Sequence, residues 1–265
     1  MTAPAAAPPG PMRLALRQVR YENRSFWRNP ASAFFTAAFP LMFLFIFEVA
    51  FGGEDIQAGN RTVDISTFFV PAIAALAIVT TCFTNVAMSV TFDRDQGLLK
   101  RLRGTPLPNW AFLFGRIAHA TLLGLALVTV VTAVGALALG VEVPTNTMAA
   151  FLVTVAVGAA SFCALGLAMT AAVPNADAAP AIINAVVLPL YFFSDVFIHI
   201  EDPPAWIDIL GNVFPVKHLS LALQTAFDPF ETGAGFEPFH LAVIAAWGVA
   251  GALLAARFFS WEPRR

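Results

Sequence analysis

Six long apolar segments recur along this chain, and they constrain its fold more than any other feature of the sequence. They cover residues 30–51, 65–92, 110–139, 148–173, 181–198 and 239–261. A helix needs about 20 predominantly apolar residues to cross the roughly 30 Å hydrocarbon core of a bilayer. Inside that core the backbone must satisfy its own hydrogen bonds, which a helix does. The sequence therefore predicts an all-α integral membrane protein with six transmembrane helices in a single domain over residues 29–261.

The composition agrees with a membrane protein. Charged residues make up 12% of the chain, about half of what a typical soluble domain carries. The two cysteines, Cys82 and Cys163, each lie inside an apolar segment with no second metal ligand at a suitable spacing. We interpret them as small buried apolar side chains and not as a disulfide or a metal site.

The chain begins with two segments that precede the first apolar one. Residues 1–11 are rich in Ala and Pro, and we expect a disordered tail. Residues 12–28 carry five arginines on one helical stripe beside an apolar stripe. This pattern predicts an amphipathic helix at the membrane interface, facing anionic lipid or a partner protein; an exposed basic helix without a further role is the alternative. The arginines are Arg13, Arg17, Arg20, Arg24 and Arg28.

The polar stretch between the second and third apolar segments is rich in positive charge. Residues 93–116 hold five of the fifteen Lys and Arg residues. Gly and Pro after residue 103 break the stretch into short pieces, because Pro lacks an amide donor. We expect a short charged helix over residues 96–103 and then a stiff elbow, together forming a loop over 93–109 that a partner could grip. An ordinary basic loop is the alternative.

The region 205–227 is apolar enough to suggest a seventh crossing, but charged and Pro residues interrupt it. With six crossings and a cytoplasmic N-terminus, only Arg61 and Lys217 among the Lys and Arg residues lie outside. A seventh crossing would move the basic C-terminus outside, against the positive-inside rule. We therefore predict broken or re-entrant helices on the outer side, and both termini in the cytoplasm.

Three stretches resemble the permeases of type-2 ATP-binding-cassette (ABC) exporters, in particular the daunorubicin/doxorubicin-resistance type. The loop GLLKRLRGTPLPNWAFLFGR resembles the charged helix and Thr-Pro step that open the third span of that family. FWRNPASAFFTAAFPLMFLFIF resembles the entry to its first span. Residues 171–198, followed by PPAWIDILGNVFPVKHLSLALQ, resemble its fifth span and outer re-entrant helices. The similarity covers nearly the whole chain after the tail.

This resemblance implies a permease subunit that moves an amphipathic or hydrophobic substrate, such as a drug, lipid or glycolipid, out across the cytoplasmic membrane. ATP and Mg would be held by two separate cytoplasmic ATPase subunits, with no cofactor in this chain. A second permease copy would complete the path, and we favour a homodimer over a heterodimer. Residues expected to couple to the ATPase are Gln96, Leu98, Leu99, Lys100, Arg101, Arg103, Thr105 and Pro106.

The resemblance also suggests residues along the substrate path. Asp195 departs from the family, which usually has a small residue there, and a carboxylate within a bilayer is costly. It would line the outer part of the path or pair with Lys217 or His218; alternatively it marks the water-exposed end of its helix. The candidate path residues are Phe39, Pro40, Phe193, Asp195 and Lys217.

Several motifs are absent from the sequence. It contains no GxxxxGK[ST] phosphate-binding loop, no HExxH and no GxSxG, so we predict no catalytic residue, and we expect no nucleic-acid partner. The alternative function is a secondary, ion-coupled multidrug transporter, which predicts an internal repeat and intramembrane charges. An intramembrane enzyme is a third class, but no Ser or His constellation in the sequence supports it.

Overall fold

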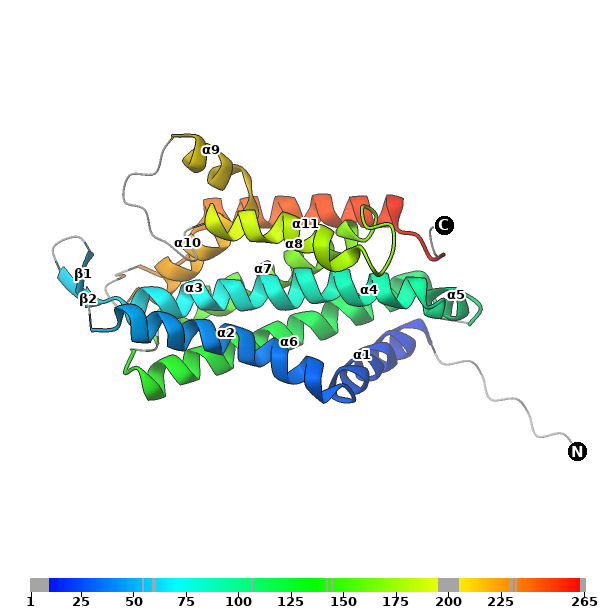
Figure 1. Ribbon diagram of the computed structural model, residues 1–265, viewed down its shortest axis with the longest axis horizontal. Helices are drawn as coiled ribbons and strands as arrows, with labels where there is room; N and C mark the ends of the chain where they lie inside the picture. Colours follow the sequence, from blue (N-terminus) through cyan, green and yellow to red (C-terminus); the bar gives the residue numbers. More distant parts are fainter. Residues whose placement is uncertain are drawn as a thin grey trace, which may run out of the picture.

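The computed structural model describes residues 10–53, 55–58, 61–105, 107–141, 143, 145–194, 205–228, 231 and 233–262. Its long helices run along a common axis, with a β-hairpin at one end and α1 and α5 at the other (Figure 1). We call these the hairpin end and the basic end. The elements are α1 (Pro11–Trp27), α2 (Pro30–Phe51), β1 (Asp55–Ala58), β2 (Arg61–Asp64), α3 (Ser66–Ile78), η1 (Val79–Thr84), α4 (Asn85–Asp95), α5 (Leu98–Arg103), α6 (Asn109–Ala138), α7 (Met148–Met169), α8 (Ala179–Phe192), α9 (Ala205–Val213), α10 (Pro215–Phe227) and α11 (Pro238–Phe258).

Within the described residues, five helices are long and apolar enough to cross a membrane. They are Pro30–Phe51, Ser66–Asp95, Trp110–Ala138, Met148–Met169 and Pro238–Phe258. The predicted fifth span, 181–198, corresponds to α8, which has only 14 residues and so a length of about 21 Å. Residues 195–198 of the predicted span lie outside the described residues. The helical membrane fold is thus confirmed, with five candidate spans.

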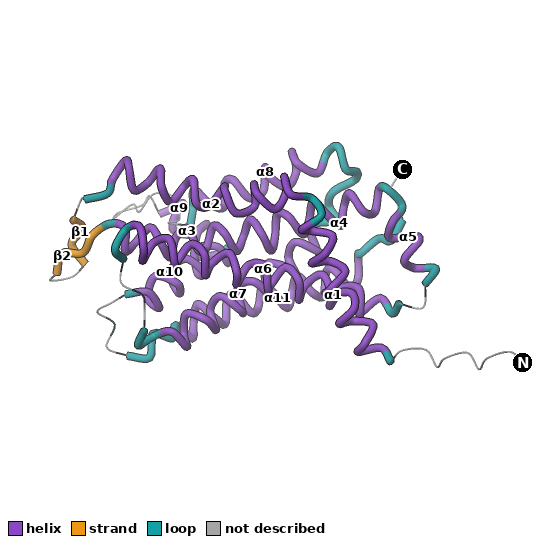
Figure 2. The backbone as a smooth tube through the Cα atoms, turned by 90° about the horizontal axis from the view of Figure 1, so that it is seen from below, coloured by secondary structure: helices purple, strands orange, loops and turns teal. Residues whose placement is uncertain are grey.

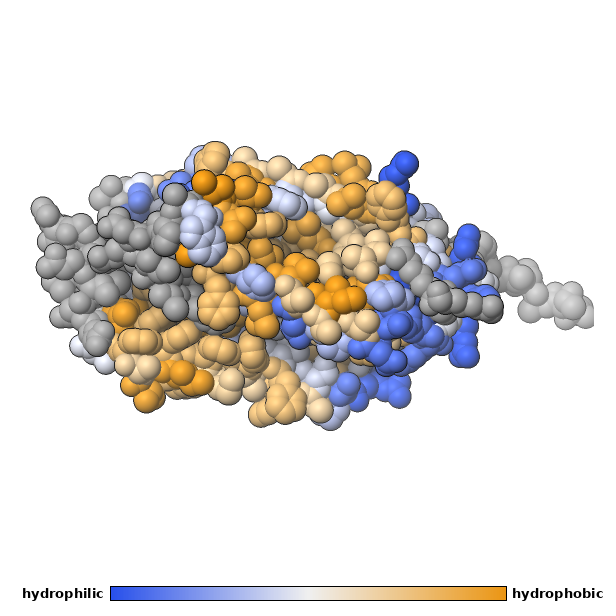
Figure 3. All heavy atoms as spheres, turned by 45° about the horizontal axis from the view of Figure 1, so that its top comes forward, coloured by the Kyte–Doolittle hydropathy of each residue, from blue (hydrophilic) through white to orange (hydrophobic). Residues whose placement is uncertain are grey.

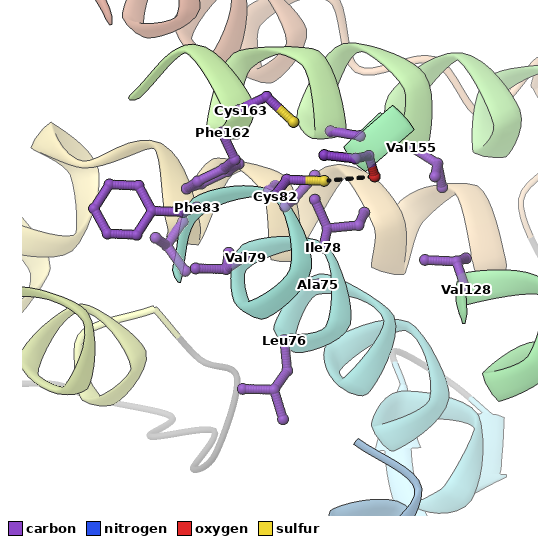
Figure 4. Packing of buried hydrophobic residues seen from close by; sticks show 14 of the residues in the cluster. Ala75, Leu76, Ile78, Val79, Cys82, Phe83, Val128, Val155, Phe162 and Cys163 are labelled. Carbon is purple, nitrogen blue, oxygen red and sulfur yellow. Dashed lines mark hydrogen bonds between the residues drawn. The ribbon is translucent and has the colours of Figure 1, made fainter. Parts of the chain in front are cut away.

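The segment Ser66–Asp95 is the central helix of the bundle. It runs without a break through α3, η1 and α4. Within an 18-residue apolar stretch of this segment, 78% is buried inside the protein. Its middle, η1, is a π-helix, a form that inserts an extra residue into the turn. Figure 4 shows Cys82 of η1 in the core, with its Sγ directed to the carbonyl oxygen of Ala120 at 3.4 Å. Both cysteines are free and buried, as predicted.

Glycines on α7 and α11 allow these two helices to pack closely. A Cβ atom at Gly251 would lie 2.9 Å from the amide nitrogen of Leu165, and one at Gly248 would lie 2.9 Å from the Cα of Ser161. A Cβ at Gly166, on α7, would lie 2.7 Å from the carbonyl oxygen of Phe83 in η1. Small residues thus bring α7 into backbone contact with both α11 and the central helix.

Two of the connections between helices lie toward the hairpin end (Figure 1). β1 and β2 pair as an antiparallel hairpin, a small addition to the helical fold that the sequence analysis did not predict. The predicted break within 205–227 is present: α9 ends at Val213, and α10 begins at Pro215 after the extended residue Phe214. Pro at the first helical position favours such a start, because its missing N–H would be unsatisfied there anyway.

Polar and apolar side chains separate along the bundle axis. Figure 3 shows a broad apolar surface over the middle of the molecule and hydrophilic residues gathered toward the basic end. Figure 2 shows α1 inclined to the long helices at that end, with α5 beyond the end of α4. The basic helices α1 and α5 therefore share one end of a largely apolar body.

Candidate functional site

The candidate site is the short helix α5, which projects at the basic end. Gly97 adopts a left-handed conformation, φ 72°, and this ends α4 and redirects the chain into α5. Leu99 is fully buried and Leu102 is half-buried, so one side of α5 packs against the hydrophobic core. Three cations remain on its exposed side: Lys100, Arg101 and Arg103. α5 thus presents a compact basic surface on a fixed apolar base.

The other predicted coupling residues flank this surface. Gln96 and Leu98 are exposed where α4 gives way to α5. The Thr105 hydroxyl donates to the carbonyl oxygen of Leu102 at 2.6 Å and so closes the end of α5. Pro106 lies outside the described residues. The structure brings the described members together around one six-residue helix.

Arg94 is buried inside the protein and is not part of the exposed basic surface. Its guanidinium is 1% exposed and donates to the carbonyl oxygens of Thr170, Val173 and Pro174 at 2.9, 2.7 and 3.1 Å. The neighbouring Asp95 accepts from the amide of Ala176 at 2.5 Å. Carbonyls at the end of a helix lack intrahelical donors, so Arg94 caps α7 from the end of α4.

Arg116 on α6 forms a second buried link at the basic end. It pairs with Asp93 of α4 and, at 3.3 Å, with Glu22 of α1. Gln18 donates to the same Glu22 carboxylate at 2.7 Å. This cluster ties α1, α4 and α6 together at the basic end. Together, Arg94 and Arg116 link α1, α4, α6 and α7 at the basic end.

The helix α1 packs on the bundle through a face that is neither its predicted arginine stripe nor its predicted apolar stripe. All five predicted arginines are exposed, and the apolar residues Met12 and Leu16 are 62% and 60% exposed. The face that packs on α6 is a third one, made of Ala15, Gln18 and Glu22. Gln18 fits because Gly115 has no side chain; a Cβ there would lie 2.7 Å from the Cβ of Gln18. Met12 and Leu16 therefore stay exposed on the surface of α1.

The predicted path residues fall into two separate places. Phe39 and Pro40 lie on α2, whose main helix contacts are with α1, α3 and α6. Phe193 and Lys217 approach each other beside Gly211, where an added Cβ would meet the carbonyl oxygen of Phe193 and the Cδ of Lys217.

One interpretation of Asp195 from the sequence pairs it with Lys217 or His218. Asp195 lies outside the described residues, so its pairing stays a prediction. Lys217 forms an ion pair with Asp208 at 2.6 Å. His218 contacts a ring nitrogen of His240 at 2.7 Å and the carbonyl oxygen of Asn212 at 2.9 Å. These contacts link α9, α10 and α11 toward the hairpin end.

Sequence reasoning missed the role of two residues at the basic end. Glu22 is the one acidic residue within 12–28, and that isolation was the available signal for an internal ion pair. Arg94 carried no such signal, because its partners are backbone carbonyls far away in the sequence. Among the described residues, no group of three or more His, Cys, Asp and Glu could hold a metal ion.

Comparisons with known proteins agree with these features. The ABC-2 type transporter family matches residues 16–227, well over half of the chain. The probable multidrug ABC transporter permease YbhR of Escherichia coli K12 is 24% identical over 162 residues, which is 61% of this chain and 44% of YbhR. The daunorubicin resistance ABC transporter permease protein DrrB1 of Streptomyces coeruleorubidus is 28% identical over 194 residues, 69% of this chain and 64% of DrrB1. The chain thus spans less than two thirds of either relative.

The family match includes α5, both arginine links and the break between α9 and α10. The chain is therefore a multi-pass membrane protein that belongs to the ABC-2 type transporter family.

Proposed function

We propose that this chain is the permease subunit of an ATP-driven exporter and that α5 is the element through which a separate ATPase drives it. ATP and Mg would be bound by two cytoplasmic ATPase subunits. The substrate would be amphipathic or hydrophobic, such as a drug, lipid or glycolipid. Both relatives are ABC transporter permeases by name, one multidrug and one for daunorubicin resistance.

The observation that carries this proposal is the exposed cationic face of α5 on a rigid base. Lys100, Arg101 and Arg103 offer a surface complementary to acidic groups on a docking partner. Arg94 and Arg116 connect that base to α1, α6 and α7. Displacement of α5 would then move spanning helices as units, because packed helices shift between discrete arrangements and do not deform continuously. The interfacial helix α1 would flank the docked subunit with its arginines.

A six-crossing topology is supported by the course of the chain. α7 ends at the basic end, where Arg94 caps it. α11 begins toward the hairpin end and ends at the basic end (Figure 1). The intervening chain must cross the length of the bundle, and α8, with 14 residues, is the longest helix described in that connection. With α8 as the fifth crossing, both termini lie on the basic side, which the positive-inside rule assigns to the cytoplasm. The segment α9–α10 would be the outer re-entrant element of the cytoplasmic-membrane protein.

A second copy of the chain would complete the substrate path. Only 17% of an 18-residue apolar stretch of α2, and 22% of the corresponding stretch of α11, is buried inside the protein. Much of the surface of these two helices is therefore available to lipid or to a partner permease. Phe39 and Pro40 of α2 would line the path from one region, and Phe193, Asp195 and Lys217 from the outer region. Family membership favours this function over an ion-coupled secondary transporter.

The test is complex formation with the candidate ATPase, using Arg101→Glu combined with Arg103→Glu. We expect the double reversal to dissociate the complex or to uncouple its ATPase activity from transport in proteoliposomes. The matched control is Thr145→Glu with Asn146→Glu, which places two acidic residues at exposed positions of the opposite end. The proposal fails if no ATPase binds the wild-type chain, or if both double variants behave alike.

A further inference from the structure

A cavity of about 270 Å³ opens between α8 and α11, and the proposed coupling mechanism does not use it. Its floor is formed by η1 and α7, where Phe83 and Phe162 are buried. α8 forms one wall with Val186, and α11 forms the other with Leu254; these two side chains are partly exposed at the rim. The cavity is thus a groove with a buried floor and an open side.

The described residues that line the groove offer water almost no polar partner. Every side chain that lines it is apolar except for the indole N–H of Trp247. That N–H already donates to the carbonyl oxygen of Val213 at 2.9 Å. A cavity of this size has room for several waters, but each needs two or more polar partners. Within a membrane span, hydrocarbon is the material that can fill such a space.

The shape of the groove restricts what hydrocarbon fits. Trp247 and Leu254 both line it and are separated by two turns of α11, about 10 Å along the helix. Phe214, at the break between α9 and α10, stacks on Trp247 with centroids 5.9 Å apart and lines the same end. The groove therefore runs along the helix axes, as an extended alkyl chain would, from Phe214 toward the basic end.

A cation lies beyond the other end of the groove. Arg257 is exposed in the last turn of α11, one turn after Leu254 and toward the basic end. An acyl chain in the groove would place its glycerophosphate group at this level, and a cation there complements a phosphate.

We propose that the groove between α8 and α11 is a binding site for one acyl chain of a membrane phospholipid, with the lipid phosphate near Arg257. The acyl chain would contact Phe83 and Phe162 at the floor of the groove and Trp247 at the end beside Phe214. It would supply the packing that α8 lacks, since this helix contacts mainly α4 and η1.

Fluorescence quenching by brominated lipid tests this site, because Trp247 lines it. A variant that keeps Trp247 alone, with Trp27, Trp110, Trp206 and Trp261 changed to Phe, is purified in detergent. It is titrated with phosphatidylglycerol brominated on its acyl chains. We expect saturable quenching that approaches one lipid per chain. Quenching that only rises in proportion to the lipid fraction would overturn the proposal.

Filling variants in the same background distinguish the groove from the general lipid surface. Ala168→Phe occupies the groove and should abolish the saturable quenching; Val186→Phe, at the rim, serves if Ala168→Phe does not fold. Leu253→Phe is the control, since Leu253 lies on α11, is 66% exposed and does not line the groove. Equal saturable quenching in all three variants would contradict the site.

Arg257→Gln examines the position of the phosphate. One cation near a lipid phosphate contributes about 1 kcal/mol, so we expect about fivefold weaker binding of phosphatidylglycerol. Unchanged binding would show that the phosphate does not lie beside Arg257.

Discussion

The guanidinium of Arg94, at the end of α4, lies 2.9 Å from the carbonyl oxygen of Thr170, at the end of α7. The two residues are 76 positions apart in the chain. Through this contact the helix that leads into α5 is joined directly to the helix that packs against α11. The same guanidinium also holds the turn between α7 and α8 through two further carbonyls.

Replacing Arg94 by Met should destabilise the protein strongly. The change leaves three backbone carbonyls without their charged donor and Asp95 without its neighbouring cation. We expect the free energy of unfolding to fall by about 3 kcal/mol or more, measured by detergent-induced unfolding in mixed micelles. Arg101→Met, on the exposed face of α5, is the matched control and should change it by about 0.5 kcal/mol or less. Equal effects would contradict the capping role of Arg94.

Gly251→Ala should disturb the contact of α7 with α11. The new Cβ would lie 2.9 Å from the amide nitrogen of Leu165, and the α7 backbone cannot yield as a flexible side chain would. Overpacking of this kind costs about 1–3 kcal/mol, measurable in the same unfolding assay. Ala250→Val, at the neighbouring exposed position of α11, should have little effect. If both variants unfold like the wild type, this helix contact is looser than described.

The hydroxyls of Tyr191 and Thr80 should couple α8 to the central helix. They lie 3.0 Å apart, and Tyr191 is buried. Hydrogen bonds between membrane helices contribute about 0.6 kcal/mol on average and up to about 1.7. A double-mutant cycle of Tyr191→Phe and Thr80→Val should yield a coupling energy in this range. A cycle that closes at zero would show that the hydrogen bond contributes nothing to stability.

The contact between α9 and α10 should weaken in acid. The hydrogen bond from Lys217, and then its positive charge, lower the pKa of Asp208 below its usual value of 3.8. A depressed pKa stabilises the fold above the unfolded-state pKa, and this contribution is lost as the pH falls through the folded-state pKa. Hydrogen–deuterium exchange of α9, corrected for intrinsic rates, should therefore show protection at neutral pH that declines below pH 3.8.

Asp208→Asn is the control for this pH dependence. Its α9 amides should exchange faster than those of the wild type at neutral pH and should lack the acid-dependent loss. Wild-type protection equal to that of the variant at pH 7 would show that the ion pair does not hold α9 in place.

Much of the fold could be read from local patterns. Apolar segment lengths predicted the positions of α2, α6, α7 and α11 to within a few residues. Arginine spacing predicted α1, and Pro215 with its polar neighbours predicted the break before α10. These features depend on residues close together in the chain, whose periodicity and helix-breaking chemistry are visible in the sequence.

The candidate site was predictable only in part. The structure has a short helix, Leu98–Arg103, within the predicted charged helix 96–103, and its three cations are exposed. The basic stretch 93–116 nevertheless contained two arginines with a different role. Nothing in their local spacing distinguishes Arg94 and Arg116, which are buried cross-links, from Arg101, which is exposed.

The sequence by itself determined that this chain is a helical membrane protein with a basic helix between its second and third spans, because hydrophobicity and charge act locally along the chain. Only the tertiary structure decided which cations face outward and which are paired inside. It also decided where the π-helix η1 lies within the central helix and where the groove between α8 and α11 lies. Those outcomes depend on carbonyls, carboxylates and glycine surfaces brought together from distant segments, and no local pattern encodes that proximity.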